Sequence, residues 1–252
     1  MPWRERRARV RDPIGSRPRT EEIAMSESVV VARPEGPARQ LMLLFHGVGA
    51  TAQDLVPLGK VLAAEFPEAF IVSIAAPLPS DLGGAGRQWF SIQGISEENR
   101  PERVGAALPA FVEAVARWQA EASVGTDAVA LIGFSQGGIM ALESTRDRPA
   151  IAGRVVSIAG RFAALPESPN LATTVHMFHG KADPVVHYGF TVEAAKHLVA
   201  IGGDVTADVM PGVGHEINAE IAELLIERLR GHLPKRVWEA AMKAAREGEG
   251  DD

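Results

Sequence analysis

The chain has 252 residues, of which 46% are hydrophobic and 23% are charged, close to the average for soluble globular proteins. Its net charge of −6 argues against nucleic acid as the main partner, because such binding needs a basic surface that neutralises phosphates. The absence of cysteine excludes disulfides, thiolate metal sites and a cysteine nucleophile, and a reducing cytoplasm is the simplest location.

Residues 1–24 differ in composition from the rest of the chain. They contain seven arginines and three prolines but few apolar residues, so they cannot bury enough surface to offset the entropy of ordering. We expect a disordered extension, either a basic arm for nucleic acid or anionic membrane or, as we favour, the product of a start upstream of Met25. We find neither a secretory signal pattern nor an apolar run of transmembrane length, so we expect no integral membrane association.

Residues 25–246 alternate short apolar runs with longer stretches of helical period. This pattern predicts one α/β domain, with a mostly parallel central sheet flanked by helices. The predicted strands are Ser28–Ala32, Gln40–Phe45, Phe70–Ile74, Ala128–Ile132, Arg154–Ile158, Thr173–Phe178 and Val205–Met210. The predicted helices are Gln53–Phe66, Pro101–Glu121, Gln136–Arg146, Val186–Ile201, Glu216–Arg230 and Pro234–Arg246. Pro109 either kinks the second helix or marks its start, and residues 247–252 are predicted to form an acidic tail.

A long segment without a clear period connects Pro77 to Arg100. Such loops in compact domains are often functional, although a mobile surface excursion is the alternative. Trp89 and Phe90 favour the functional interpretation, because large apolar side chains have little reason to lie in a solvated loop. The loop follows a predicted strand, so we expect both side chains to line a pocket beside the active site.

The segment Gly133-Phe134-Ser135-Gln136-Gly137 matches the nucleophile elbow G-x-S-x-G. In this turn a serine hydroxyl is lifted above the edge of a sheet, between a strand and a helix. The apolar run before the motif and the helical run after it provide that setting. We therefore predict Ser135 as a nucleophile.

A serine needs a base and an acid that orients the base, and on this type of fold they follow in the order Ser, Asp, His. Asp183 lies in a loop after the strand predicted at Thr173–Phe178, and His215 lies in the loop after the next strand. All three residues then lie at one edge of the sheet, where ligands bind in open α/β folds. The order and placement predict a Ser135, Asp183 and His215 triad.

The reaction also needs two donors for the oxyanion of the tetrahedral intermediate. The amide after the nucleophile, that of Gln136, is one. The segment His46-Gly47-Val48-Gly49 follows an early strand, and its glycines allow the Val48 amide to point into the site; the alternative is an ordinary glycine turn.

The remaining histidines indicate no metal. His176 and His179 face opposite sides of a predicted strand, whereas His187, His197 and His232 fall in helical stretches as surface or boundary residues. We predict no cofactor and no metal ion.

Five blocks of the sequence together resemble the phospholipase/carboxylesterase family, which includes acyl-protein thioesterases, lysophospholipases and compact bacterial esterases. The blocks are Leu44–Gly49, Gln88–Phe90, Gly133–Gly138, His179–Val185 and Gly212–His215. The resemblance covers about Met25 to Pro234 and looks closest to the bacterial esterase branch. It implies an α/β-hydrolase fold and the triad and oxyanion residues given above. Ala50 stands where family members often carry an acidic residue, which leaves the subgroup and the substrate open.

The expected function is hydrolysis of a small-molecule carboxylic ester or thioester by a monomer or homodimer. The alternatives are another acyl hydrolase on the same fold, such as a lactone hydrolase or small peptidase, and a non-catalytic binding module. A binding module would carry a broken triad or a blocked oxyanion loop, and neither is visible in the sequence.

Overall fold

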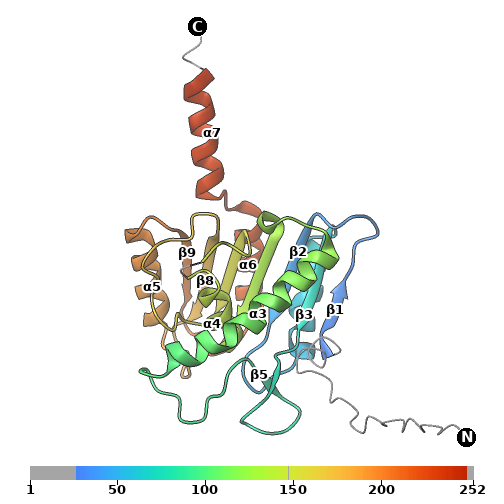
Figure 1. Ribbon diagram of the computed structural model, residues 1–252, viewed down its shortest axis with the longest axis vertical. Helices are drawn as coiled ribbons and strands as arrows, with labels where there is room; N and C mark the ends of the chain where they lie inside the picture. The colour runs from blue at the N-terminus through green and yellow to red at the C-terminus, as the bar shows by residue number, and fades with distance from the viewer. Residues whose placement is uncertain (1–26, 147, 249–252) are drawn as a thin grey trace, which may run out of the picture.

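A seven-stranded sheet forms the centre of the protein, whose computed structural model describes residues 27–146 and 148–248 (Figure 1). Its strands are β1 (Val29–Ala32), β2 (Gln40–Phe45), β3 (Ala69–Ile74), β6 (Val129–Phe134), β7 (Arg154–Ile158), β8 (Thr174–Gly180) and β9 (Asp204–Met210). The spatial order is β1-β3-β2-β6-β7-β8-β9. Only β1 runs antiparallel to its neighbour, so the mostly parallel sheet is confirmed.

Helices cover both faces of this sheet (Figure 1). They are α2 (Val56–Glu65), α3 (Arg100–Ala122), α4 (Gln136–Glu143), α5 (Gly189–Ala200), α6 (Ala219–Gly231) and α7 (Lys235–Gly248), with 3₁₀ turns at Ala52–Leu55 and Thr126–Ala128. A short pair, β4 (Leu78–Pro79) and β5 (Arg87–Gln88), lies within the segment that connects β3 to α3.

Alternate residues of one strand supply two separate apolar layers. Leu43 and Phe45 of β2 pack in the layer of α3, α4 and α5, whereas Met42 and Leu44 pack in the layer of α2 and α6. Because successive side chains of a strand point to opposite faces, and both faces of β2 are covered, its five buried positions from Leu41 to Phe45 are all apolar rather than alternately apolar and polar. This explains why its sequence reads as a continuous apolar run.

The predicted helix Gln53–Phe66 is divided in the structure. Residues 52–55 form a 3₁₀ turn. The amide and the hydroxyl of Thr51, just before this turn, both donate hydrogen bonds to the carboxylate of Asp54. The helix α2 then begins at Val56, with proline in its first turn. The second helix runs from Arg100 through Pro109 to Ala122, so Pro109 does not mark its start. Proline fixes its own φ in the helical range, which lets the helix continue although one hydrogen bond is lost.

Two later helices begin three residues after their predicted starts. The side chain of Asp183 accepts hydrogen bonds from the amides of Val185 and Val186, and this turn delays α5 until Gly189. Asn218 caps α6 by accepting a hydrogen bond from the amide of Ile221, so α6 begins at Ala219. His187 therefore precedes α5 and His232 follows α6, rather than lying within helices as predicted.

The segment predicted as a final amphipathic helix forms α7, which projects away from the sheet (Figure 1). Arg236 donates to the Thr174 hydroxyl (3.0 Å) and Lys235 donates to the Gly202 carbonyl (3.0 Å), which fixes its first turn. Trp238, farther along, is 55% exposed. Residues 247 and 248, predicted to begin an acidic tail, belong to this helix, and residues 1–24 and 249–252 lie outside the described residues.

The described part of the chain contains no helix that is both long enough and apolar enough to span a bilayer.

Candidate active site

Ser135 occupies the tight turn between β6 and α4. Its φ of 52° and ψ of −116° fall where residues other than glycine rarely lie, and its amide donates to the carbonyl of Ile158 on the next strand (2.9 Å). Strained backbone of this kind persists only where the surroundings enforce it, and it is often found at functional sites. The turn has the shape that the sequence motif predicts.

The two glycines of the motif lie where backbone meets backbone. A Cβ atom on Gly137 would be 2.1 Å from the carbonyl oxygen of Phe45, and one on Gly133 would be 2.3 Å from the carbonyl carbon of Gly137. Neither position can hold a side chain without moving the main chain. The glycines therefore bring α4 into direct contact with the ends of β2 and β6, which places Ser135 next to the loop after β2.

His215 lies between Ser135 and Asp183. Its Nε2 is 2.9 Å from Ser135 Oγ, and its Nδ1 is 2.7 Å from Asp183 Oδ2. The three residues follow β6, β8 and β9, whose carboxyl ends share one edge of the sheet. The structure thus brings together the three side chains that the sequence singled out, in a connected line from hydroxyl to carboxylate.

Asp183 is held as an anion. Burial alone would raise its pKa, but the hydrogen bond with His215 and those from the amides of Val186 and Val185 outweigh burial and lower the pKa below its ordinary value. Those amides lie 2.8–2.9 Å from Oδ1, which leaves Oδ2 for the imidazole. A fixed carboxylate at Nδ1 leaves Nε2 of a neutral imidazole free to accept a proton.

His179 supports this carboxylate, a role that the sequence analysis missed. Its Nε2 lies 2.8 Å from the carbonyl of Val186 and 3.2 Å from Asp183 Oδ2, while its Nδ1 lies 2.7 Å from the Thr191 hydroxyl. Since Nε2 faces two oxygens, we assign the proton to Nε2 and an acceptor role to Nδ1. Burial lowers the pKa of His179, so the ring is neutral at pH 7. The available signal was its position at the end of a strand, four residues before Asp183.

The loop after β2 is fixed beside Ser135. Nε2 of the buried His46 accepts a hydrogen bond from the amide of Ala76 (3.1 Å), and Gly49 donates to the carbonyl of Arg87 in β5 (2.9 Å). A Cβ atom on Gly47 would lie only 3.1 Å from Ser135 Cβ, so this loop and the nucleophile are in contact. Val48 and Gln136 both line the cavity at Ser135, as the predicted oxyanion residues must.

The side chain of Gln136 has a further role that no sequence motif indicated. Its Oε1 accepts from the amide of Trp89 (2.7 Å), and its Nε2 donates to the carbonyl of Phe90 (2.8 Å). The residue after the nucleophile therefore fastens the long connection between β3 and α3 to the active site.

A cavity of about 460 Å³ opens at Ser135. Apolar side chains make much of its wall, and charged side chains make another part. The wall includes Phe90, Ile139, Val186 and Phe190, and also Glu97, Arg100 and Arg161. Phe90 lies where the sequence analysis expected it, and His187 borders the cavity although the sequence analysis set it aside.

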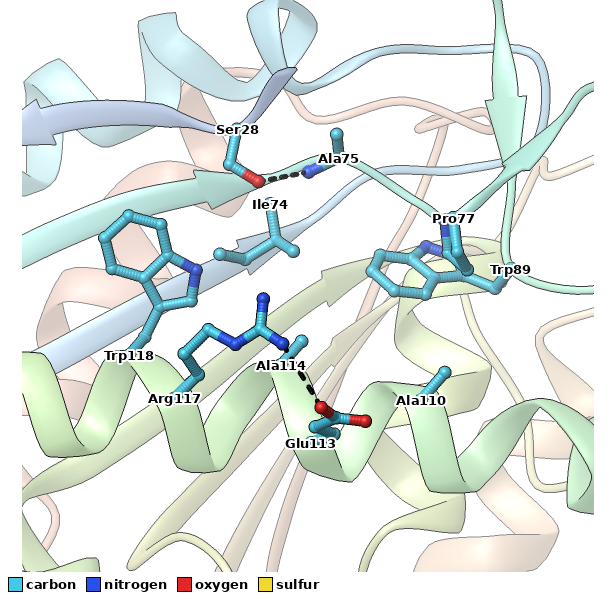
Figure 2. Close-up of a pocket in the computed structure, with 10 residues that line it drawn as sticks. All are labelled: Ser28, Ile74, Ala75, Pro77, Trp89, Ala110, Glu113, Ala114, Arg117 and Trp118. Carbon is cyan, nitrogen blue, oxygen red and sulfur yellow. Dashed lines mark hydrogen bonds and ion pairs between the residues drawn. The ribbon is translucent and has the colours of Figure 1, made fainter. Parts of the chain in front are cut away.

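Trp89 is not in the wall of the cavity at Ser135, but together with Phe90 it lines a neighbouring cavity of about 660 Å³. An acyl-binding role for Trp89 stays a prediction. Its side chain is 2% exposed, packs edge-on against Phe45 and Phe111 with ring centroids 5.5 Å away, and donates from its indole nitrogen to the His46 carbonyl (3.0 Å). Figure 2 shows its ring between Pro77 and α3, beside a separate small cavity of about 30 Å³. Phe90 lines both the cavity at Ser135 and the neighbouring one, whereas Trp89 lines the neighbouring one.

Comparison with known proteins places the chain among acyl hydrolases. Residues 26–233 match the family model described as Phospholipase/Carboxylesterase. The chain is 45% identical to Esterase YpfH of Escherichia coli over 222 residues, which cover 88% of the chain and 95% of the relative. It is 28% identical to acyl-protein thioesterase 1 of Neurospora crassa over 157 residues, 58% of the chain and 64% of the relative.

Solved structures share the architecture. The crystal structure of esterase PE8 superposes with a TM-score of 0.72 at 25% identity, over 82% of the chain and 97% of that structure. A carboxylesterase from Mesorhizobium loti gives a TM-score of 0.66 at 19% identity, over 82% of the chain and all of that structure. The second likeness concerns the fold alone.

Proposed function

Because the chain belongs to the phospholipase/carboxylesterase family, we propose that it is a serine hydrolase of the α/β-hydrolase fold that cleaves carboxylic esters or thioesters. One observation carries the proposal: the hydroxyl of Ser135, the imidazole of His215 and the carboxylate of Asp183 are connected at a cavity large enough for a small acyl group. A catalytic triad requires this connection.

In the proposed reaction His215 Nε2 takes the hydroxyl proton while Ser135 Oγ forms a bond to the carbonyl carbon of the substrate. The carbonyl oxygen becomes an oxyanion, and the amides of Val48 and Gln136 donate hydrogen bonds to it. The bond from carbon to the leaving oxygen or sulfur then breaks, and His215 gives its proton to the departing alcohol or thiol. An acyl group remains on Ser135.

Water completes the turnover by the same route. His215 takes a proton from water, the hydroxide oxygen attacks the acyl carbon, and the proton passes to Ser135 Oγ as the acid leaves. Asp183 stays ionised in both halves and stabilises the imidazolium that forms twice.

Labelling with a fluorophosphonate tests the nucleophile. We expect one covalent adduct per chain on Ser135, and no adduct on a Ser135→Ala variant of unchanged melting temperature. An unlabelled wild-type protein would favour the non-catalytic binding module.

A substrate panel tests the reaction class. We expect 4-nitrophenyl esters and acyl thioesters to be hydrolysed, with a loss of several orders of magnitude in kcat for Ser135→Ala. Exclusive activity on lactones or on peptides would favour the other acyl hydrolases, and near wild-type turnover by Ser135→Ala would refute the triad.

We further propose a cytoplasmic location and a monomer or homodimer without a nucleic-acid partner. The absence of cysteine supports the location, and the net charge of −6 argues against a nucleic-acid partner. Size-exclusion chromatography with light scattering, with and without added DNA, measures the oligomeric state and any binding of nucleic acid.

A further inference from the structure

The wall of the cavity near the start of α3 carries three charged side chains that the proposed reaction does not use. Glu97 precedes α3, Arg100 is its first residue, and Arg161 follows β7. All three line the same cavity as Ser135. Charges in a pocket wall are costly to desolvate, so their arrangement indicates which ligand the wall accommodates.

Arg161 is held rigidly. Its Nη1 and Nη2 donate to the two carboxylate oxygens of Glu97 (3.2 and 2.6 Å), and its guanidinium lies over the ring of Phe190, 3.5 Å from the centroid. Its side chain is only 12% exposed. The guanidinium is therefore a fixed cation in the wall, and the bond to Arg161 lowers the pKa of Glu97, which stays ionised.

Arg100 has donor capacity left over. Its Nη2 donates to Glu97 (3.1 Å) and its side chain is 18% exposed. Its Nε is buried and has no hydrogen-bond partner among the described residues. A guanidinium has five N–H donors, so the donors on its two Nη atoms that Glu97 does not use remain for a ligand in the cavity that Arg100 lines.

The charges of this part of the wall do not balance. Two guanidinium groups share one carboxylate, which leaves an excess of one positive charge. Asp183 also borders the cavity, but its side chain is fully buried and occupied by His215 and two backbone amides. A planar oxyanion matches both the excess charge and the geometry of guanidinium donors.

We propose that the enzyme favours esters or thioesters that carry a carboxylate of their own, which Arg100 binds together with the Arg161–Glu97 pair. This inference rests on the proposed function and names its substrate class. Arg100 and Arg161 are thus specificity-determining residues. The carboxylate belongs either to the acyl chain or to the leaving group, and the experiment separates these two sources.

Two matched substrate pairs test the proposal. The first pair is mono-4-nitrophenyl adipate and its terminal amide, 4-nitrophenyl adipamate, which differ only in the charge on the acyl chain. The second pair is the hexanoate esters of 4-hydroxybenzoate and of 4-hydroxybenzamide, which differ in the charge on the leaving group. The measured quantity is the ratio of kcat/KM within each pair, corrected for the rates of the uncatalysed reactions.

We expect the wild-type enzyme to favour the carboxylate about fivefold or more in one pair, and added salt to reduce that preference. Arg100→Gln should bring the ratio close to one, and Glu97→Gln should raise the ratio. Arg103→Gln is the matched control, because Arg103 lies one turn along α3, bonds the Ser91 carbonyl and does not line this cavity. It removes the same charge and should leave the ratio unchanged.

A wild-type ratio of one or less in both pairs overturns the proposal, and this measurement needs no variant to fold. An equal loss in Arg100→Gln and Arg103→Gln also overturns it, because the effect would then be one of net charge. In either case, Ser135-dependent hydrolysis of the ester bond in the two uncharged carboxamide substrates would leave the proposed function standing.

Discussion

Replacing Trp89 by alanine should destabilise the whole protein rather than reshape an acyl pocket. Removing a buried tryptophan side chain costs about 3–5 kcal/mol. Here the void would adjoin the cavity of about 30 Å³ already present, and the buried carbonyl of His46 would lose its donor, which favours the upper end. For a chain of this size 1 kcal/mol corresponds to roughly 2–4 °C, so we expect the melting temperature to fall by about 8–20 °C.

Activity assays on acetate, butyrate and octanoate esters distinguish this outcome from a pocket role. Trp89 bonds the His46 carbonyl at the start of the loop that carries Val48, so its loss should reduce kcat/KM by a similar factor on all three chain lengths. Trp89→Phe keeps most of the ring but not the N–H and should cost about 1–3 kcal/mol. A selective loss on octanoate, with an unchanged melting temperature, would refute this assignment of Trp89 to the core.

Three other variants follow from the geometry. Asp183→Asn should lower kcat by about 10⁴, since it favours the wrong tautomer of His215, and full activity in steady-state assays would identify another carboxylate as the partner. Gly137→Ala should prevent stable folding or abolish activity, because its Cβ would lie 2.1 Å from the Phe45 carbonyl; a normal melting curve and turnover would show that the backbone yields easily. Burial, and to a smaller extent the positive charge of Arg154, lowers the pKa of His176 to about 3 in the folded protein. In the unfolded chain the imidazole of His176 is protonated near pH 6.5. As the pH is lowered from 6.5 to 3, the free energy of unfolding should therefore decrease by up to about 1.4 kcal/mol per pH unit because of this group. His176→Gln should flatten this pH dependence, measured by urea denaturation, and an unchanged slope would contradict the assignment.

The hydrogen-bonded arrangement of the proposed triad could be predicted from the sequence because each of its three residues follows a strand that local composition reveals. Ser135, Asp183 and His215 come after apolar runs, and parallel strands place their carboxyl ends at one edge whatever the details of packing. Only the chain order and these positions were needed.

The orientation of the connection between β3 and α3 could not be predicted in the same way. The direction of Trp89 depends on the side chain of Gln136 and the carbonyl of His46, which lie more than 40 residues away in the chain. No local pattern encodes such contacts. The start of α5 was missed for a related reason, since the side chain of Asp183 takes two amides that a helix would have used.

The contact between Gly137 and the end of β2 has a consequence for how such an enzyme can diverge. Because main chain packs against main chain here, the Ser135 hydroxyl and the loop that carries Val48 must shift together if the sheet distorts. The distance between them therefore depends little on changes elsewhere in the protein. Side chains of the cavity wall, such as Arg161, have no part in that contact and can be exchanged one at a time. Substitutions in the cavity wall can therefore alter which ligand the pocket accepts while the distance between Ser135 and the loop after β2 is kept.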